Sequence, residues 1–178
     1  KANAEGLTAH YLAIANATNL PIILYNVPSR TGQDMPVSVY QRLAQIPNIV
    51  GVKEACADIT KLTQIRNTCG EDFTIWTGND ELTVPSIAMG AKGVISVASN
   101  VVPAQMRDMA DAALDGDFDT AAALQVELLP LIETLFCEVN PIPVKAAMKL
   151  IGYDCGECRL PLTAMTEQNL RHLAALLK

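Results

Sequence analysis

The sequence is poor in aromatic residues, in charged residues and in the long apolar runs that membrane spans need. Of its 178 residues, 4% are aromatic and 18% are charged, whereas 50% are hydrophobic. A chain so rich in apolar residues can build a core, which excludes an intrinsically disordered protein. No apolar run approaches the ~18 residues of a membrane-spanning helix, so we expect no membrane partner.

Positive charge is also scarce. The chain carries 13 Lys and Arg against 19 Asp and Glu, for a formal net charge of −6 and a sequence pI of about 4.8. The Lys and Arg residues form no block along the sequence. Proteins that bind nucleic acid usually show the opposite charge balance, so we do not expect a nucleic-acid partner.

The cysteines indicate the compartment. There are five of them, an odd number, and no secretion signal opens the sequence, so we expect reduced thiols and a cytoplasmic location. Cys155 and Cys158 have C-x-x-C spacing, but neither a second pair nor two His residues lie near them in sequence. We therefore predict two loop thiols rather than a zinc site or a redox pair, and no metal.

Short β-branched runs alternate with longer helical patterns over the first part of the chain. The runs are nearly continuously apolar, which is typical of strands buried on both faces of a parallel sheet. They cover residues 21–27, 49–53, 73–77 and 93–97. Helical patterns cover residues 5–18, 36–46, 59–68 and 80–89. Asp58 and Asp80 are candidate N-caps of the last two, and the spacing predicts consecutive βα units.

After residue 97 only helical patterns follow. They cover residues 103–114, 118–136 with a bend at Pro130, 143–151 and 166–177. We expect a barrel part at residues 1–114 and a helical part at residues 115–178. A closed eight-stranded barrel needs about 250 residues, so the βα units make either a small open sheet or half a barrel. The chain begins at Lys1 without Met, and we expect further sequence before it.

Ligands of parallel α/β folds gather at the carboxyl ends of the strands. Lys53 ends the second run, where desolvation would lower the pKa of its amine and make it a nucleophile for a Schiff base. The alternative is an ammonium that reaches solvent or pairs with Glu54. Tyr25 ends the first run, where its phenol can pass protons to a carbonyl adduct. Its alternative is a ring packed in the core.

The segments that follow the strands add two candidates. Arg30, in Pro-Ser-Arg-Thr-Gly, suits the capture of a carboxylate, although a solvated loop charge is equally consistent. Gly78 permits close approach of the backbone to a ligand, or simply serves a turn. Neither G-x-x-x-x-G-K-S/T nor G-x-G-x-x-G occurs, so a nucleotide cofactor has no support.

Four motifs together carry a family resemblance. They are YNVPSRTG from Tyr25, GVKEA from Gly51, GVISV from Gly93 and NPIPVK from Asn140. In this order they resemble the dihydrodipicolinate synthase family of pyruvate-dependent class I aldolases. The resemblance implies an α/β fold, a (β/α)8 TIM barrel. This chain would cover strands 5–8 and their helices, followed by a C-terminal all-helical appendage.

The resemblance also implies a reaction. Lys53 would form the Schiff base with pyruvate, Tyr25 would shuttle protons, Arg30 would bind the second substrate's carboxylate, and Ile95 and Gly78 would line the pyruvate pocket. The product with L-aspartate 4-semialdehyde is 4-hydroxy-tetrahydrodipicolinate, in lysine and diaminopimelate biosynthesis. This carbon–carbon lyase chemistry needs no cofactor, and a homotetramer is expected. Two alternatives stay open: another pyruvate-dependent aldolase such as N-acetylneuraminate lyase, and a non-catalytic half-barrel fragment.

Overall fold

The structure is a computed structural model that describes residues 1–177. The chain divides into two compact units, Lys1–Ile95 and Ser96 onward, and each is described by itself.

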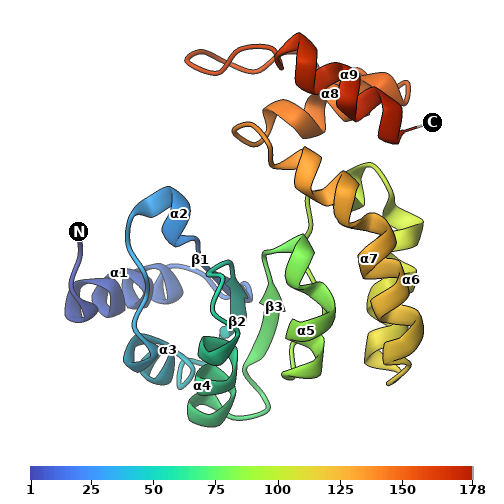
Figure 1. Cartoon of the computed structure of the whole chain (residues 1–178). Helices are drawn as coiled ribbons and strands as arrows, with labels where there is room; N and C mark the ends of the chain where they lie inside the picture. The colour runs from blue at the N-terminus through green and yellow to red at the C-terminus, as the bar shows by residue number, and fades with distance from the viewer. Residues whose placement is uncertain (178) are drawn as a thin grey trace. The chain divides into compact units, whose positions relative to one another are not determined.

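The first unit contains a parallel three-stranded sheet with the order β1-β2-β3. The strands are β1 (Ile22–Asn26), β2 (Ile49–Glu54) and β3 (Thr74–Thr77). Helices precede, connect and follow them: α1 (Ala4–Asn16), α2 (Pro28–Thr31), α3 (Val37–Leu43), α4 (Ile59–Cys69), the 3-10 turn η1 (Asp80–Leu82) and α5 (Thr83–Ala88) (Figure 1). The predicted parallel α/β arrangement is confirmed for these strands.

The core of this unit lies on one face of the sheet. Leu24, Val52 and Ile75 are buried there, together with residues of α1, α3 and α4. On the other face, Ile23 is 45% exposed and Tyr25 is 47% exposed. Within the described residues the predicted burial of the strands therefore holds for one face only. The sequence runs are apolar on both faces, but the helices cover only one of them.

The fourth predicted strand, residues 93–97, is not regular. The segment runs parallel to β3, since the Lys92 N–H donates to the Ile75 carbonyl at 2.8 Å and the Ile95 N–H donates to the Thr77 carbonyl at 2.9 Å. It contributes only an isolated bridge between Thr77 and Val94. The cause is Gly93, whose φ of 142° takes the backbone out of extended geometry.

The two predicted helix caps had different outcomes. Asp58 is the N-cap of α4, and its side chain accepts the Thr60 N–H, as predicted. Asp80 as an N-cap was wrong, because Asn79 precedes the η1 turn and Asp80 lies inside that turn, fully buried.

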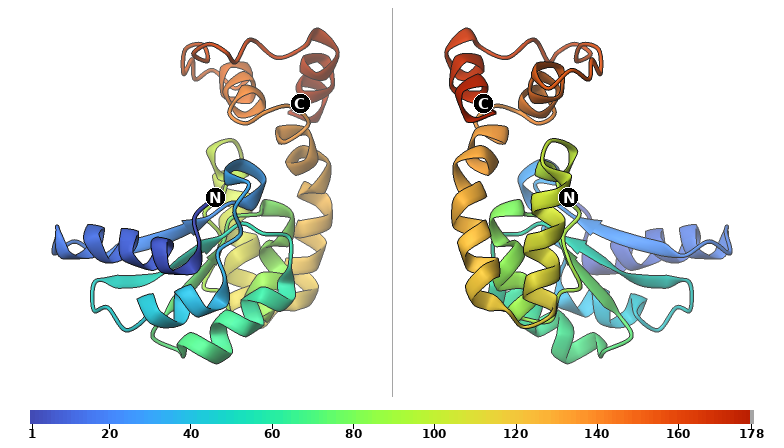
Figure 2. Two further views of the ribbon diagram at one scale, coloured as in Figure 1. Left: turned by 90° about the vertical axis from the view of Figure 1, so that its left-hand side faces the viewer. Right: turned by 90° about the vertical axis from the view of Figure 1, so that its right-hand side faces the viewer.

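The second unit is helical. It contains η2 (Ala98–Asn100), α6 (Pro103–Leu114), α7 (Phe118–Leu135), α8 (Ile142–Leu150) and α9 (Glu167–Leu176). Each of the four long helices matches its predicted range to within one residue. Helix α6 packs along α7, and α9 packs against α7 and α8 (Figure 2). Cys155 and Cys158 lie in the loop before α9, as predicted, and both are free thiols.

A partly exposed carboxylate, that of Glu138 after α7, holds two segments of this unit together. One carboxylate oxygen accepts hydrogen bonds from the Thr166 N–H at 3.1 Å, the Thr166 hydroxyl at 2.7 Å and the Asn169 amide at 2.7 Å. The hydrogen bonds from Thr166 and Asn169 lower the pKa of Glu138. The carboxylate thus holds the start of α9 against the segment after α7.

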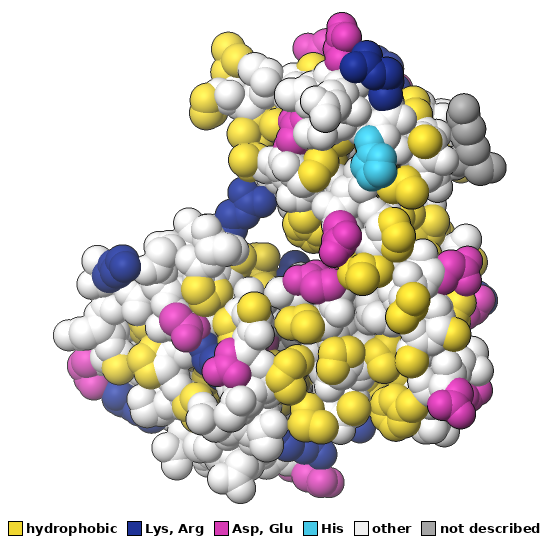
Figure 3. All heavy atoms as spheres, viewed as in Figure 1, with side chains coloured by type: hydrophobic (Ala, Val, Ile, Leu, Met, Phe, Trp, Pro, Cys, Tyr) yellow, Lys and Arg dark blue, Asp and Glu magenta, His cyan; other side chains and the backbone are white. Residues whose placement is uncertain are grey.

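The surface carries dispersed charge. On the face that Figure 3 shows, Lys and Arg side chains are scattered among acidic and apolar ones rather than gathered into one patch. None of the helices in residues 1–177 is long and apolar enough to cross a membrane.

Candidate active site

The site is centred on Lys53 and Tyr25, which are direct partners in the parallel ladder of β1 and β2. The Lys53 Nζ lies 4.3 Å from the centroid of the Tyr25 ring. This position over the ring face is attractive for an ammonium group. Lys53 is half-buried, and neither it nor the half-exposed Tyr25 belongs to the core on the helix-covered face. The alternative of a Tyr25 ring packed in that core was therefore wrong.

Gly78 lies against the stem of the lysine. Its N–H donates to the main-chain carbonyl of Glu54 at 2.7 Å, which draws the segment after β3 onto the end of β2. A Cβ at this position would lie 2.9 Å from Lys53 Cε and 2.7 Å from Ala55 Cβ. Such distances are shorter than real Cβ contacts, so only glycine allows this approach without displacing a neighbour. The backbone at residue 78 therefore limits where the Lys53 side chain can lie.

Arg30 and Ile95 are placed at the same edge of the sheet by their positions in the chain. Arg30 lies in α2, directly after β1, and is exposed. Ile95 is 38% exposed and follows the bridge beside β3. Its N–H is already bonded to the Thr77 carbonyl. The structure thus brings Lys53, Tyr25 and Gly78 into direct proximity and places Arg30 and Ile95 at the carboxyl ends of β1 and β3.

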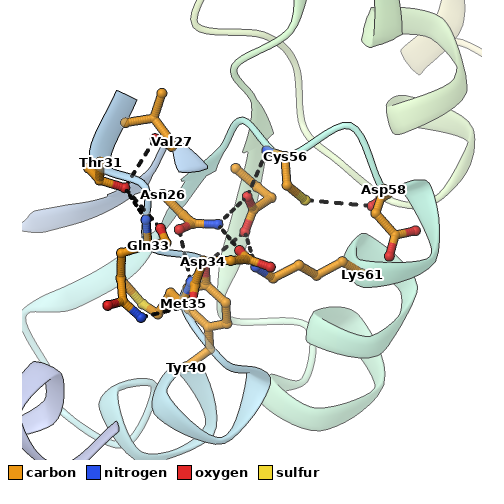
Figure 4. A network of polar contacts seen from close by, with 11 residues as sticks. Asn26, Val27, Thr31, Gln33, Asp34, Met35, Tyr40, Cys56, Asp58 and Lys61 are labelled. Carbon is orange, nitrogen blue, oxygen red and sulfur yellow. Dashed lines mark hydrogen bonds and ion pairs between the residues drawn. The ribbon is translucent and has the colours of Figure 1, made fainter. Parts of the chain in front are cut away.

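A polar network lies on the opposite, helix-covered face of the same strand ends (Figure 4). The buried carboxylate of Glu54 accepts hydrogen bonds from Asn26 Nδ2 at 2.7 Å and from the Tyr40 hydroxyl at 2.7 Å. Lys61, on α4, lies 3.5 Å from Glu54 Oε2 and also pairs with Asp34. The alternative pairing of Lys53 with Glu54 was wrong, because Glu54 points to this network.

Burial and charge shift the pKa values of three members. Burial and the neighbouring Glu54 carboxylate raise the pKa of the Tyr40 phenol far above its ordinary value. Partial burial works to raise the pKa of Asp34, but hydrogen bonds from Lys61 and Asn26 outweigh it and hold that pKa below its ordinary value. Burial raises the pKa of the Cys56 thiol to about 11. Both phenol and thiol therefore stay protonated at neutral pH.

Sequence reasoning missed this network. The sequence feature that could have revealed it is the alternation of side chains along a strand. Asn26 follows Tyr25 and Glu54 follows Lys53, so Asn26 and Glu54 point away from the site and toward the helices. A polar residue at such a position needs buried partners. Lys61 lies four residues before the buried Ile65 and therefore faces the same side of α4.

Metal-binding side chains do not gather in the part of the chain that the structure describes. Among residues 1–177, no group of three or more His, Cys, Asp and Glu side chains is arranged to hold a metal ion. All five cysteines are free, with Cys137 and Cys155 exposed.

The whole chain, residues 1–178, matches the model of the Dihydrodipicolinate synthetase family. The chain belongs to this family. Among its relatives, the 4-hydroxy-tetrahydrodipicolinate synthase of Methanosarcina mazei is 53% identical over 98% of this chain and 60% of its own length. The synthase of Thermoanaerobacter sp. (strain X514) is 45% identical over 99% of this chain and 60% of its own length.

Solved structures of family members share the fold. Dihydrodipicolinate synthase from Bacillus anthracis matches with a TM-score of 0.95 and 40% identity, over 99% of this chain and 61% of that protein. The enzyme from Aquifex aeolicus matches with a TM-score of 0.96 and 40% identity, over 99% of this chain and 61% of that protein. The chain therefore has the α/β fold of the family and spans about 60% of the length of its curated relatives.

Proposed function

We propose that the protein containing this chain condenses pyruvate with L-aspartate 4-semialdehyde to 4-hydroxy-tetrahydrodipicolinate, as a carbon–carbon lyase of the class I aldolase type. The observation that carries the proposal is the Lys53 amine over the Tyr25 ring at the carboxyl ends of two parallel strands. Family membership and relatives of this name at about half identity support it.

The proposed chemistry starts with the neutral amine of Lys53 attacking the keto carbon of pyruvate. The Tyr25 phenol supplies a proton, so that the carbinolamine hydroxyl leaves as water and a protonated imine forms. Loss of a proton from the methyl carbon gives an enamine, with the iminium nitrogen taking up the electron pair, so the reaction needs no cofactor. The enamine carbon then attacks the aldehyde of the semialdehyde. The amino group of the semialdehyde displaces Lys53 from the imine, which closes the ring and frees the enzyme.

The other residues take supporting roles in this proposal. The Tyr25 phenol passes protons to and from the adduct, which its proximity to the Lys53 amine supports. Arg30 binds the carboxylate of the semialdehyde through its guanidinium. Gly78 and Ile95 line the pyruvate pocket, and Gly78 does so by leaving room beside the Lys53 stem.

The proposal extends to the complete fold. We infer that this chain supplies strands 5–8 of a (β/α)8 barrel over residues 1–114 and a C-terminal helical appendage over residues 115–178. The exposed sheet face at Ile23 and Tyr25 supports this, because a barrel interior would cover it. We also expect a homotetramer, which light scattering on the purified protein would test. We expect its location to be cytoplasmic.

Reductive trapping tests the chemistry. The protein expressed from its complete reading frame is incubated with pyruvate and borohydride, and its intact mass and peptides are measured. We expect an increase equal to pyruvic acid less one oxygen atom, located on Lys53, and none in Lys53→Ala. Lys92→Ala is the matched control, since Lys92 is exposed near the opposite end of the sheet. A reduced adduct that persists in Lys53→Ala would refute the assignment.

The second substrate distinguishes this synthase from other pyruvate aldolases. Pyruvate should form the adduct in either case. Only the synthase should consume L-aspartate 4-semialdehyde together with pyruvate, whereas a sugar-acid aldolase such as N-acetylneuraminate lyase should release pyruvate from its own substrate. The names of the relatives favour the synthase.

A further inference from the structure

The two reactive side chains and the buried network belong to consecutive positions of the same two strands. Tyr25 pairs with Lys53 in the ladder, and the next pair is Asn26 with Glu54. Because side chains alternate along a strand, the first pair faces the site and the second faces the helices. Any movement of one strand end past the other would therefore displace both pairs together.

The second pair is joined through its side chains as well as its backbone. Asn26 Nδ2 donates to Glu54 Oε1 at 2.7 Å, and the Asn26 main-chain carbonyl accepts the Ala55 N–H at 2.9 Å. Asn26 also donates to Asp34 at 2.8 Å and accepts the Met35 N–H at 3.1 Å through its Oδ1. One side chain thus connects β1, β2 and the segment that leads into α3.

The Glu54 carboxylate is held from several elements. Besides the bond from Asn26, it accepts the Tyr40 hydroxyl from α3 at 2.7 Å and the Cys56 N–H at 2.9 Å. Lys61 of α4 lies 3.5 Å away and supplies the opposite charge. A carboxylate that is fully removed from water requires such partners, and it fixes their geometry in return.

The main chain of Glu54 links this network to the reactive side. Its carbonyl accepts the Gly78 N–H, and Gly78 in turn lies against the Lys53 stem. The end of β2 is therefore fixed from one face by the network and from the next strand by Gly78. At the end of β1, the Asn26 side chain and the Asn26 main-chain carbonyl both join the strand to β2, one residue beyond the Tyr25–Lys53 pair.

We propose that Asn26 and Glu54 are positioning residues for the reaction: their cross-strand hydrogen bond, on the buried face, keeps the Tyr25 phenol beside the Lys53 amine on the site face. The proposal rests on the proposed function, because it concerns the reactivity of Lys53. Neither side chain touches the reacting atoms. Their contribution is made through the strand ends that carry Lys53 and Tyr25.

The test compares two ways of weakening the same network. Asn26→Ala removes the cross-strand side-chain bond, together with the side-chain bonds to Asp34 and Met35. Tyr40→Phe removes one hydrogen bond from the same carboxylate but keeps the bond between Asn26 and Glu54. The rate of reductive trapping at saturating pyruvate and the kcat and KM of the condensation are measured on the complete protein, at a temperature where circular dichroism shows every variant folded. If Asn26→Ala does not fold, Asn26→Ser replaces it, because serine leaves a smaller cavity than alanine.

We expect Asn26→Ala to lower the trapping rate and kcat by about tenfold, because reacting groups lose effectiveness when misplaced by a fraction of an ångström, with a smaller change in KM. Tyr40→Phe should lower stability but keep the trapping rate within about twofold. Glu54→Gln keeps an oxygen that can accept from Asn26 and should retain more of the rate than Glu54→Ala.

The outcomes separate the two proposals. If the unsubstituted protein forms no reduced adduct on Lys53, the proposed function fails. If it does, but Asn26→Ala and Tyr40→Phe either both keep the rate or both lose it to the same extent, the positioning role is overturned, because the network then contributes only to stability.

Discussion

Replacing Gly78 by alanine should impair Lys53 through contact alone, without removing any functional group. The added Cβ would lie 2.9 Å from Lys53 Cε, 3.3 Å from Lys53 Cγ and 2.7 Å from Ala55 Cβ. The Ala55 methyl cannot rotate away, since it is attached directly to the backbone. Either the backbone at residue 78 moves back, or the Lys53 stem is pushed aside.

The magnitude follows from these distances. Ordinary contacts begin at about 3.4 Å, so the atoms must separate by about half an ångström or more. Overpacking of this kind costs about 1–3 kcal/mol of stability. A displacement of about 1 Å at a reacting group can cost a hundredfold in rate, so a shift of half that size should slow trapping about tenfold.

The assay is a time course of reductive trapping with pyruvate, followed by intact mass. Gly6→Ala, in helix α1, is the control. A Cβ at Gly6 would meet only the side-chain oxygen of the N-cap residue Asn3, at 3.3 Å. We expect Gly6→Ala to trap at the unsubstituted rate. If Gly78→Ala is destabilised but traps pyruvate on Lys53 just as fast, the Lys53 stem is not confined by residue 78 and the account of the site is wrong.

Three further predictions concern the stability of the two units. Leu24→Ala should cost about 2–5 kcal/mol in urea unfolding, because Leu24 is fully buried, whereas Leu20→Ala at a 71% exposed position should change it by less than about 0.5 kcal/mol. The lowered pKa of Asp34 means that its carboxylate stabilises the fold above its ordinary pKa of 3.8, and this contribution is lost as the pH falls through the lowered value. Asp34→Asn should therefore be less stable at neutral pH, and the difference should shrink in strong acid; a constant difference would contradict the ion pair with Lys61. Glu138→Ala should lower the melting temperature more than Glu138→Gln, which keeps an acceptor oxygen, and equal losses would show that the hydrogen bonds do not hold α9.

Helices and regular strands could be predicted because their signals are local. The helices of the second unit follow from the apolar period, from Pro103 at a first turn, and from Gly116 and Gly152, which follow α6 and α8. The segment at residues 93–97 looked equally regular in composition. Its departure from a strand depends on the backbone conformation of Gly93, and a glycine in a sequence does not reveal whether its φ is positive.

The positions of Lys53 and Tyr25 could be predicted, but their environment could not. Strand ends and the parallel connection place both at one edge of the sheet, and the register makes them neighbours. The distance between the amine and the ring depends on side-chain conformations. Among residues 1–177 the predicted burial holds for one strand face only, because apolar composition shows that a face can be covered but not which residues cover it.

The missed network shows why residues next to a predicted site can matter as much as the site itself. Residues that follow a reactive strand position point to the opposite face, so sequence proximity to Lys53 suggested a pair with Glu54 that strand geometry forbids. The same geometry makes Glu54 useful, because a buried carboxylate can be fixed by β1, α3 and α4 without entering the site. A side chain on the site face would have to leave room for substrate. One on the buried face can be surrounded completely, and this is why the proposed positioning pair lies one residue beyond the pair to which we assign the reaction.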